Sequence, residues 1–170
     1  WHTTLLVFAG VILLILPLSL ALAVPKNVET PAQRAAQQSV GAAFGEAIRH
    51  PSFVLLVIGY FSCGFQVFFV TMHLPAYLVD RGLSADLGAF VIGAIGLFNI
   101  IGSIGAGYLA NLMPKRYILA AIYFLRAVAV AAFIAVPATP ATSIAFGEVM
   151  GLLWLSTIPP TNALIALMFG

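Results

Sequence analysis

Apolar residues in this 170-residue chain form long runs that short polar segments separate. Runs such as Leu5-Leu6-Val7-Phe8 do not alternate with polar residues, which excludes the short alternating strands of a membrane β-barrel. A helix needs about 20 mostly apolar residues to cross a bilayer. The stretches that meet this length predict an all-α membrane protein with five transmembrane helices, at Thr4 to Val24, Ser52 to Val79, Ser84 to Met113, Tyr117 to Val136 and Thr142 to Phe169.

A polar stretch from Pro25 to Pro51 interrupts this pattern, and we interpret it as a linker between two units of helices. After Ser39, a potential helix cap, apolar residues recur at helical spacing. These residues are Val40, Phe44, Ala47 and Ile48. The spacing predicts a short helix that lies on the membrane surface. A disordered linker is the alternative, because small and polar residues dominate this stretch.

Composition supports a membrane protein, since 62% of the residues are hydrophobic and only 7% are charged. The formal net charge of +2 is spread thinly along the chain, so no basic patch could follow a phosphate backbone. Nucleic acid is therefore excluded as a partner. Basic residues mark one side of the expected spans, at Lys26, Arg34, Arg49, Lys115 and Arg116, whereas Arg81 lies on the other. The positive-inside rule then predicts a linker that faces the cytoplasm.

Two charged residues lie inside the expected spans, Arg126 in the fourth and Glu148 in the fifth. Their depths below the loop between these spans differ by about 4.5 Å, at 1.5 Å of rise per residue. Because a lone charge in a bilayer is costly, we expect the two side chains to form an ion pair. One interpretation is purely structural. In the functional alternative, Arg126 also binds a substrate anion, and protonation of Glu148 releases Arg126 for it.

The second expected span carries polar residues on one helical face, namely Ser62, Gln66, His73 and Tyr77. We expect this face to point into the helix bundle or a water-filled cavity, which makes Gln66 and His73 candidate substrate ligands. For His73 the alternative is a hydrogen bond between helices. The single cysteine, Cys63, is interpreted as a small buried hydrophobic residue.

Small residues and prolines predict how the helices pack. Gly147 and Gly151 have the spacing of a GxxxG motif, so we expect them at a contact between helices, as for the glycines of the third span. The Pro159-Pro160 pair must bend or break the fifth span. No nucleophile elbow, P-loop or HExxH motif occurs, so neither an enzyme nor a metal or other cofactor is predicted.

The segment GYLANLMPKR, from Gly107 to Arg116, resembles the degenerate second copy of the GxLaDrxGrr loop motif of the major facilitator superfamily. Asn111 stands at the aspartate of that motif, and Pro114 stands at its second glycine. The polar linker is placed like the central loop between the two six-helix halves of that family. The resemblance implies that the chain is a fragment of a twelve-helix bundle, from the sixth helix to the tenth.

The same resemblance implies a division of the chain into three parts. Residues 1–25 are the last transmembrane helix of the N-terminal half, 26–50 are the cytoplasmic linker, and 51–170 are the first four helices of the C-terminal half. The segments HPSFVLLVIGYFSCGF, VTMHLPAYLVDRGLS and GLLWLSTIPPTNAL are similar to bacterial relatives of the monocarboxylate transporters and oxalate/formate antiporters. Many of those proteins have an anion-binding Arg four residues after an Asp or Asn. Here Asn99 keeps the first position, and Ser103 takes the second.

The resemblance implies a secondary active transporter for a small organic anion, a carboxylate, which works by alternating access in a bacterial cytoplasmic (inner) membrane. Arg126, His73, Gln66 and Asn99 are then the candidate substrate ligands, and Glu148 is the candidate for proton coupling. The expected partners are the small-molecule substrate, protons, the lipid bilayer and the remaining helices of the same chain. Two alternatives stay open, an exporter of lipophilic compounds and a membrane sensor without transport.

Overall fold

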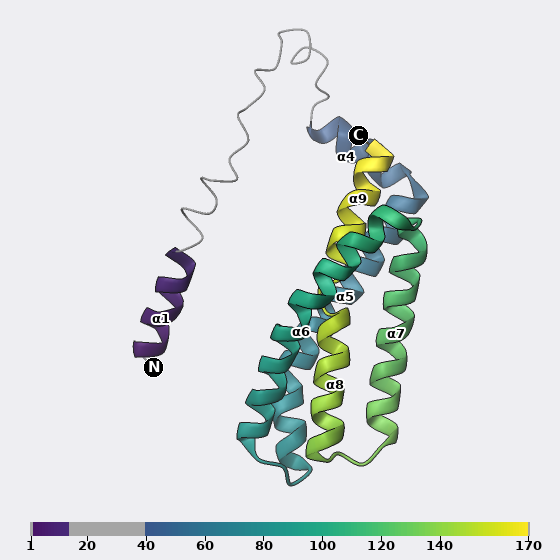
Figure 1. The fold of residues 1–170 in the computed structure, drawn as a ribbon. Helices are drawn as coiled ribbons and strands as arrows, with labels where there is room; N and C mark the ends of the chain where they lie inside the picture. Colours follow the sequence, from purple (N-terminus) through teal and green to yellow (C-terminus); the bar gives the residue numbers. More distant parts are fainter. Residues whose placement is uncertain (1, 14–39, 170) are drawn as a thin grey trace. The chain divides into compact units, whose positions relative to one another are not determined.

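The computed structural model describes residues 2–13 and 40–169 of the chain (Figure 1). Contacts divide the chain into two units, Trp1–Ala43 and Phe44–Gly170. In the first unit, α1 (His2–Leu13) forms the described part of the expected first span. The rest of that span lies outside the described residues, as do Ser39 and the basic residues Lys26 and Arg34.

The short helix expected in the linker is confirmed as α4 (Val40–Arg49). Ala47 is buried, whereas Phe44 and Ile48 of the same predicted face are exposed. His50 then takes an extended conformation, and the next helix starts at Pro51. Proline suits the first position of a helix because the backbone N–H that it lacks has no helical partner there. A location on the membrane surface stays a prediction for α4.

Four helical stretches in the described part of the chain are long and apolar enough to cross a membrane. Three are single helices, α5 (Pro51–Asp80), α6 (Ala85–Leu112) and α7 (Lys115–Ala135). The fourth runs from Pro140 to Phe169 and consists of α8 (Pro140–Leu153) and α9 (Ile158–Phe169). Short turns make consecutive spans antiparallel (Figure 1). The all-α membrane fold is therefore confirmed.

The helix ends separate the basic residues as expected. Arg49 ends α4 and Lys115 begins α7, at the same end of the bundle as the start of α5. Arg81 follows α5 at the opposite end. The turn after Arg81 needs glycine, because Gly82 has a φ of +82°. Which end faces the cytoplasm stays a prediction.

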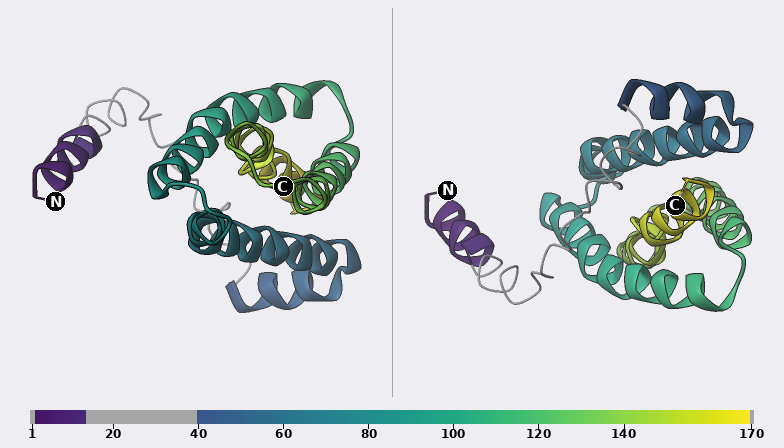
Figure 2. Two further views of the ribbon diagram at one scale, coloured as in Figure 1. Left: turned by 90° about the horizontal axis from the view of Figure 1, so that it is seen from below. Right: turned by 90° about the horizontal axis from the view of Figure 1, so that it is seen from above.

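The helix pair α8 and α9 lies inside the arc formed by α5, α6 and α7 (Figure 2). Its closest packing is against α6. A Cβ atom added to Gly147 would come within 2.8 Å of Val91 Cγ1, and one added to Gly151 would come within 2.7 Å of the Ile95 carbonyl oxygen. The predicted contact of Gly147 and Gly151 is thus confirmed, because only glycine lets these backbones approach so closely.

Only part of the glycine prediction for α6 holds. A Cβ atom at Gly102 would overlap the carbonyl group of Leu152, so Gly102 is part of the contact with α8. Gly93, Gly96 and Gly105 have open space around them in the described part of the chain. Close packing of these three stays a prediction, since α8 covers only one face of α6 and they lie outside it.

The expected break of the last span is confirmed between Leu153 and Ile158. Pro159 and Pro160 fall in the first turn of α9, where a missing backbone N–H costs no helical hydrogen bond. Some backbone groups of the break pair locally, since the N–H of Trp154 donates to the Gly151 carbonyl oxygen and the N–H of Thr161 donates to that of Thr157. The N–H of Leu155 pairs instead with a side chain from another helix.

Candidate functional site

Arg126 lies near the middle of α7 and is only 1% exposed, although it carries a permanent positive charge. Its Nη1 donates a hydrogen bond to Sγ of Cys63 on α5, at 3.0 Å. Its other two nitrogens, Nε and Nη2, are buried and have no hydrogen-bond partner among the described residues. Buried donors are nearly always paired in proteins, so this guanidinium needs an explanation.

Cys63 connects Arg126 to the break between α8 and α9. The side chain of Cys63 is 5% exposed, and its Sγ lies 3.5 Å from Oγ1 of the fully buried Thr157. The same sulfur lies 4.0 Å from the carbonyl oxygen of Trp154, a distance within the range for sulfur. The burial expected for Cys63 is confirmed, but its role is polar as well. Helices α5 and α7 and the break between α8 and α9 therefore meet at this thiol.

Tyr123 extends this cluster along α7. It lies one turn before Arg126, and a Cβ atom added to Gly59 of α5 would come within 3.3 Å of its hydroxyl oxygen. Sequence reasoning did not select Tyr123, Cys63 or Thr157. Because these residues are apart in sequence and common in membrane helices, only their helical phases relative to Arg126 could have indicated them.

The predicted ion pair between Arg126 and Glu148 is wrong. Among residues 2–13 and 40–169, no carboxylate forms a salt bridge with Arg126, and Nε and Nη2 lack any partner. Glu148 is half-buried on α8, where the preceding Gly147 packs against α6. The prediction matched the depths of the two residues in the membrane. Depth does not fix the rotation of each helix about its axis, and that rotation decides which side chains meet.

Asn99 stabilises the break itself. Its Oδ1 accepts a hydrogen bond from the backbone N–H of Leu155, at 3.0 Å, and another from Oγ of Ser103, at 3.3 Å. The carbonyl oxygen of Leu152, on the other side of the break, accepts from Oγ of Ser156 at 2.6 Å. Asn99 therefore has a structural function in the bundle, and its role as a substrate ligand stays a prediction.

The polar face of α5 does not point into the described bundle. Ser62 and His73 are exposed, Gln66 and Tyr77 are half-buried, and the His73 ring packs against Phe69 at 4.6 Å. The described helices therefore do not enclose Ser62 and His73, and a location of this face in a water-filled cavity stays a prediction. Instead, the buried face of α5 consists of the residues Cys63, Val70, Leu74 and Leu78. Ser62, His73 and Tyr77 each precede one of these by one residue, which rotates them by about 100° about the axis.

Comparisons with known proteins now identify the family. The family model for the Major Facilitator Superfamily matches residues 1–170. This chain belongs to the major facilitator superfamily. It is also 36% identical over 70 residues to YcxA, an uncharacterized MFS-type transporter of Bacillus subtilis (strain 168). That match covers 41% of this chain and 17% of YcxA, so the chain spans well under two thirds of this relative. No solved structure matches the chain.

In this major facilitator superfamily chain, the cluster around Arg126 buries a positive charge that the described residues pair only in part. A cation in a low-dielectric interior is strongly destabilised unless an anion or several hydrogen bonds compensate it. The described residues supply only one acceptor, the sulfur of Cys63. The described residues hold no cluster of three His, Cys, Asp or Glu side chains.

Proposed function

We propose that this chain is part of a secondary active transporter that carries a small organic anion, a carboxylate, and that Arg126 binds it. Membership of the superfamily and the apolar helices support a membrane transporter rather than an enzyme. The observation that carries the substrate class is the buried guanidinium of Arg126, with two nitrogens that have no partner in the described part of the chain.

A carboxylate fits this site for two reasons. Its negative charge would neutralise the buried cation, where a low dielectric strengthens the attraction. Its two oxygens match a pair of N–H donors on a guanidinium, which forms bidentate bonds to carboxylates. The sequence similarity to bacterial relatives of the monocarboxylate transporters and oxalate/formate antiporters supports the same substrate class.

The proposal also covers the place of this chain in the whole transporter and the other residues of the site. Residues 1–25 belong to the N-terminal half, 26–50 to the cytoplasmic linker and 51–170 to the C-terminal half of a twelve-helix transporter in a bacterial inner membrane. Alternating access moves the two halves against each other. Gln66 and His73, on the uncovered face of α5, and Asn99 at the break contribute to substrate binding. Glu148 is the candidate proton carrier, acting without direct contact to Arg126.

Counterflow in proteoliposomes that contain the intact transporter tests this function. Uptake of radiolabelled lactate and oxalate is compared for the wild type, Arg126→Gln and Arg116→Gln. Arg116 lies on the same helix but is exposed, so Arg116→Gln is the matched control. We expect Arg126→Gln to reduce carboxylate counterflow at least about tenfold, since it removes a charged hydrogen-bond donor. Wild-type counterflow by Arg126→Gln contradicts the proposal.

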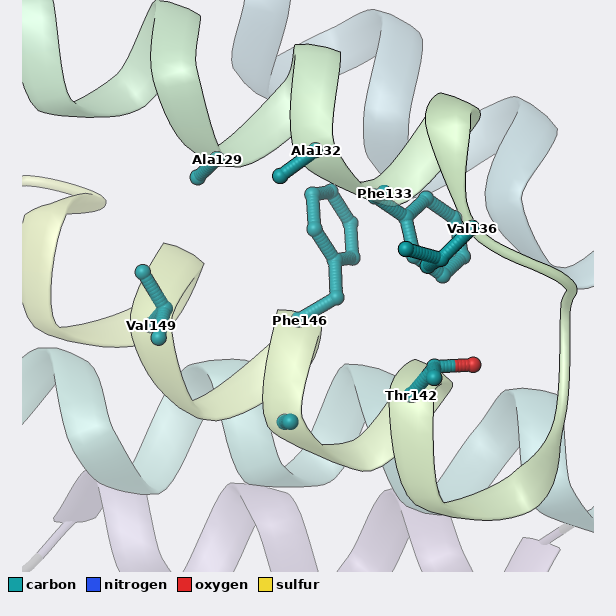
Figure 3. Close-up of a pocket in the computed structure, with 8 residues that line it drawn as sticks. Ala129, Ala132, Phe133, Val136, Thr142, Phe146 and Val149 are labelled. Carbon is teal, nitrogen blue, oxygen red and sulfur yellow. The ribbon is translucent and has the colours of Figure 1, made fainter.

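Export of lipophilic compounds is the second candidate, and an apolar surface pocket between α7 and α8 favours it (Figure 3). The pocket has a volume of about 330 Å³. Phe146 extends from α8 toward Ala132 and Phe133 of α7, and the two phenylalanine rings stack at 4.2 Å. The other residues that line the pocket are Ala129, Val136, Thr142, Ala145 and Val149.

Filling the pocket separates the two candidates. Ala145→Phe adds an aromatic ring to the pocket and leaves Arg126 in place. An exporter of lipophilic compounds loses efflux of an uncharged fluorescent dye with Ala145→Phe and keeps it with Arg126→Gln. A carboxylate transporter loses carboxylate counterflow with Arg126→Gln and keeps it with Ala145→Phe.

A further inference from the structure

The thiol of Cys63 accepts a hydrogen bond from only one of the three nitrogens of the Arg126 guanidinium. The hydrogen bond from Arg126 to Sγ uses Nη1, whereas Nε and Nη2 remain without partners among the described residues. Nε and Nη2 share one edge of the planar group, and their N–H bonds on that edge are parallel. The contact with Cys63 thus leaves the Nε–Nη2 edge buried and without a partner among the described residues. This edge has the geometry that binds both oxygens of a carboxylate at once.

The break between α8 and α9 can orient the thiol for this role. A thiol has one S–H donor, and its sulfur can accept. The Trp154 carbonyl oxygen and Thr157 Oγ1 lie at 4.0 and 3.5 Å from Sγ, and both can accept the S–H hydrogen. The sulfur lone pairs then face Nη1 of Arg126.

We infer that Cys63 is a positioning residue that fixes Arg126 so that its Nε–Nη2 edge binds a carboxylate side-on. This inference rests on the proposed anion site and adds the geometry with which that site recognises two-oxygen anions. Without an acceptor at Cys63, Nη1 joins the unpaired donors and the guanidinium can rotate about its side-chain bonds. Selectivity for carboxylates over a spherical anion such as chloride should then fall. The binding of chloride does not depend on a fixed orientation of the two N–H donors, whereas bidentate binding of a carboxylate does.

Three substitutions of Cys63 test the inference in the purified intact transporter. Cys63→Ser keeps an acceptor, Cys63→Val keeps the approximate volume without an acceptor, and Cys63→Ala removes both. Anion binding is measured as the rise in melting temperature with formate, acetate, lactate, oxalate or chloride. Melting temperatures without added anion show whether each variant is folded, and Cys63→Val serves if the smaller Cys63→Ala does not fold.

We expect Cys63→Val and Cys63→Ala to raise the half-saturating carboxylate concentration about tenfold, the scale of a hydrogen bond to a charged group. Cys63→Ser should stay within about threefold of the wild type, and the chloride response should not change in any Cys63 variant. Arg126→Lys, which keeps the charge but has no planar fork, should lose the preference for carboxylates over chloride. If Cys63 had only a structural role, its substitution would weaken the binding of all anions equally.

The outcomes separate this inference from the function on which it rests. If no carboxylate in the panel stabilises the wild type, or Arg126→Gln responds like the wild type, the anion site itself is contradicted. If Arg126→Gln loses the response but Cys63→Val and Cys63→Ala keep wild-type affinity and selectivity, only the positioning role is contradicted. An equal loss for carboxylates and chloride in the Cys63 variants also contradicts it.

Discussion

Glycines bring the backbones of α6 and α8 together, whereas the cluster around Arg126 buries polar groups that the described residues only partly pair. At Gly147 and Gly151, the groups that would meet an added Cβ belong to Val91, Ile95 and Phe98 and include backbone atoms, so the two helix backbones are in close contact. At Arg126, two buried nitrogens lack partners. The first region satisfies what a membrane bundle needs for stability. The second does not, and the proposed anion would supply what it lacks.

The two regions meet at the break between α8 and α9. Gly102 contacts the carbonyl group of Leu152 at one side of the break, and Cys63 lies beside Thr157 at the other. Asn99, from the same helix as Gly102, accepts from the backbone N–H of Leu155 between them. The close contact of α6 thus supports the backbone that helps to orient the thiol. Substitutions should therefore damage folding on the α6 side and anion binding on the Arg126 side.

The largest effect on the stability of the fold is expected at Gly102. Gly102→Val places a branched side chain against the backbone carbonyl of Leu152, which cannot move without separating α6 from α8. We expect a loss of about 3 kcal/mol of stability, at the upper end for overpacking, and little folded protein. Size-exclusion chromatography of the detergent-solubilised transporter measures the folded yield. Gly96→Val is the control, because Gly96 has open space around it; equal yields for the two variants contradict the close contact.

Replacing Arg126 should raise stability while it removes function. Arg126→Met keeps much of the side-chain volume and eliminates a buried charge that lacks an anion, so we expect about 2 kcal/mol of added stability. The melting temperature in detergent without added anions measures this effect, and Arg116→Met is the exposed control. A lower melting temperature for Arg126→Met would show that the charge is compensated in the folded transporter.

A moderate effect is expected at Asn99. Asn99→Leu leaves the part-buried N–H of Leu155 without its acceptor, which should cost about 1 kcal/mol. Asn99→Asp keeps an acceptor oxygen and tests whether the hydrogen bond rather than the shape matters. Asn111→Leu, at an exposed position, is the control. Melting temperatures that are the same for Asn99→Leu and Asn111→Leu would contradict a role of Asn99 at the break.

The smallest effect is expected at Thr157. Its Oγ1 lies 3.5 Å from Cys63 Sγ, and a thiol is only a weak donor and acceptor, so Thr157→Val should cost about 0.5 kcal/mol. The hydroxyl of Thr161, one turn later, is buried without a partner among residues 2–13 and 40–169. Thr161→Val should therefore be neutral or stabilising. A melting temperature that falls more for Thr161→Val than for Thr157→Val would contradict these two expectations.

The sequence by itself determined the features that depend on one helix at a time. The lengths of the apolar runs gave the four described spans, the spacing after Ser39 gave α4, and the Pro159-Pro160 pair gave the break. The spacing of Gly147 and Gly151 indicated a contact between helices. These features follow from periodicity, helix length and the missing N–H of proline, all of which are local properties of the chain.

Only the tertiary structure decided how the helices are rotated about their axes, and with it the partners of the buried polar groups. Arg126 contacts Cys63 rather than Glu148, and α5 buries the face that carries Cys63 rather than the face that carries His73. Neighbouring residues on a helix point about 100° apart, so a rotation by one position exchanges an interior residue for an exposed one. That rotation is set by the packing of all the helices together, which no single segment of the sequence contains.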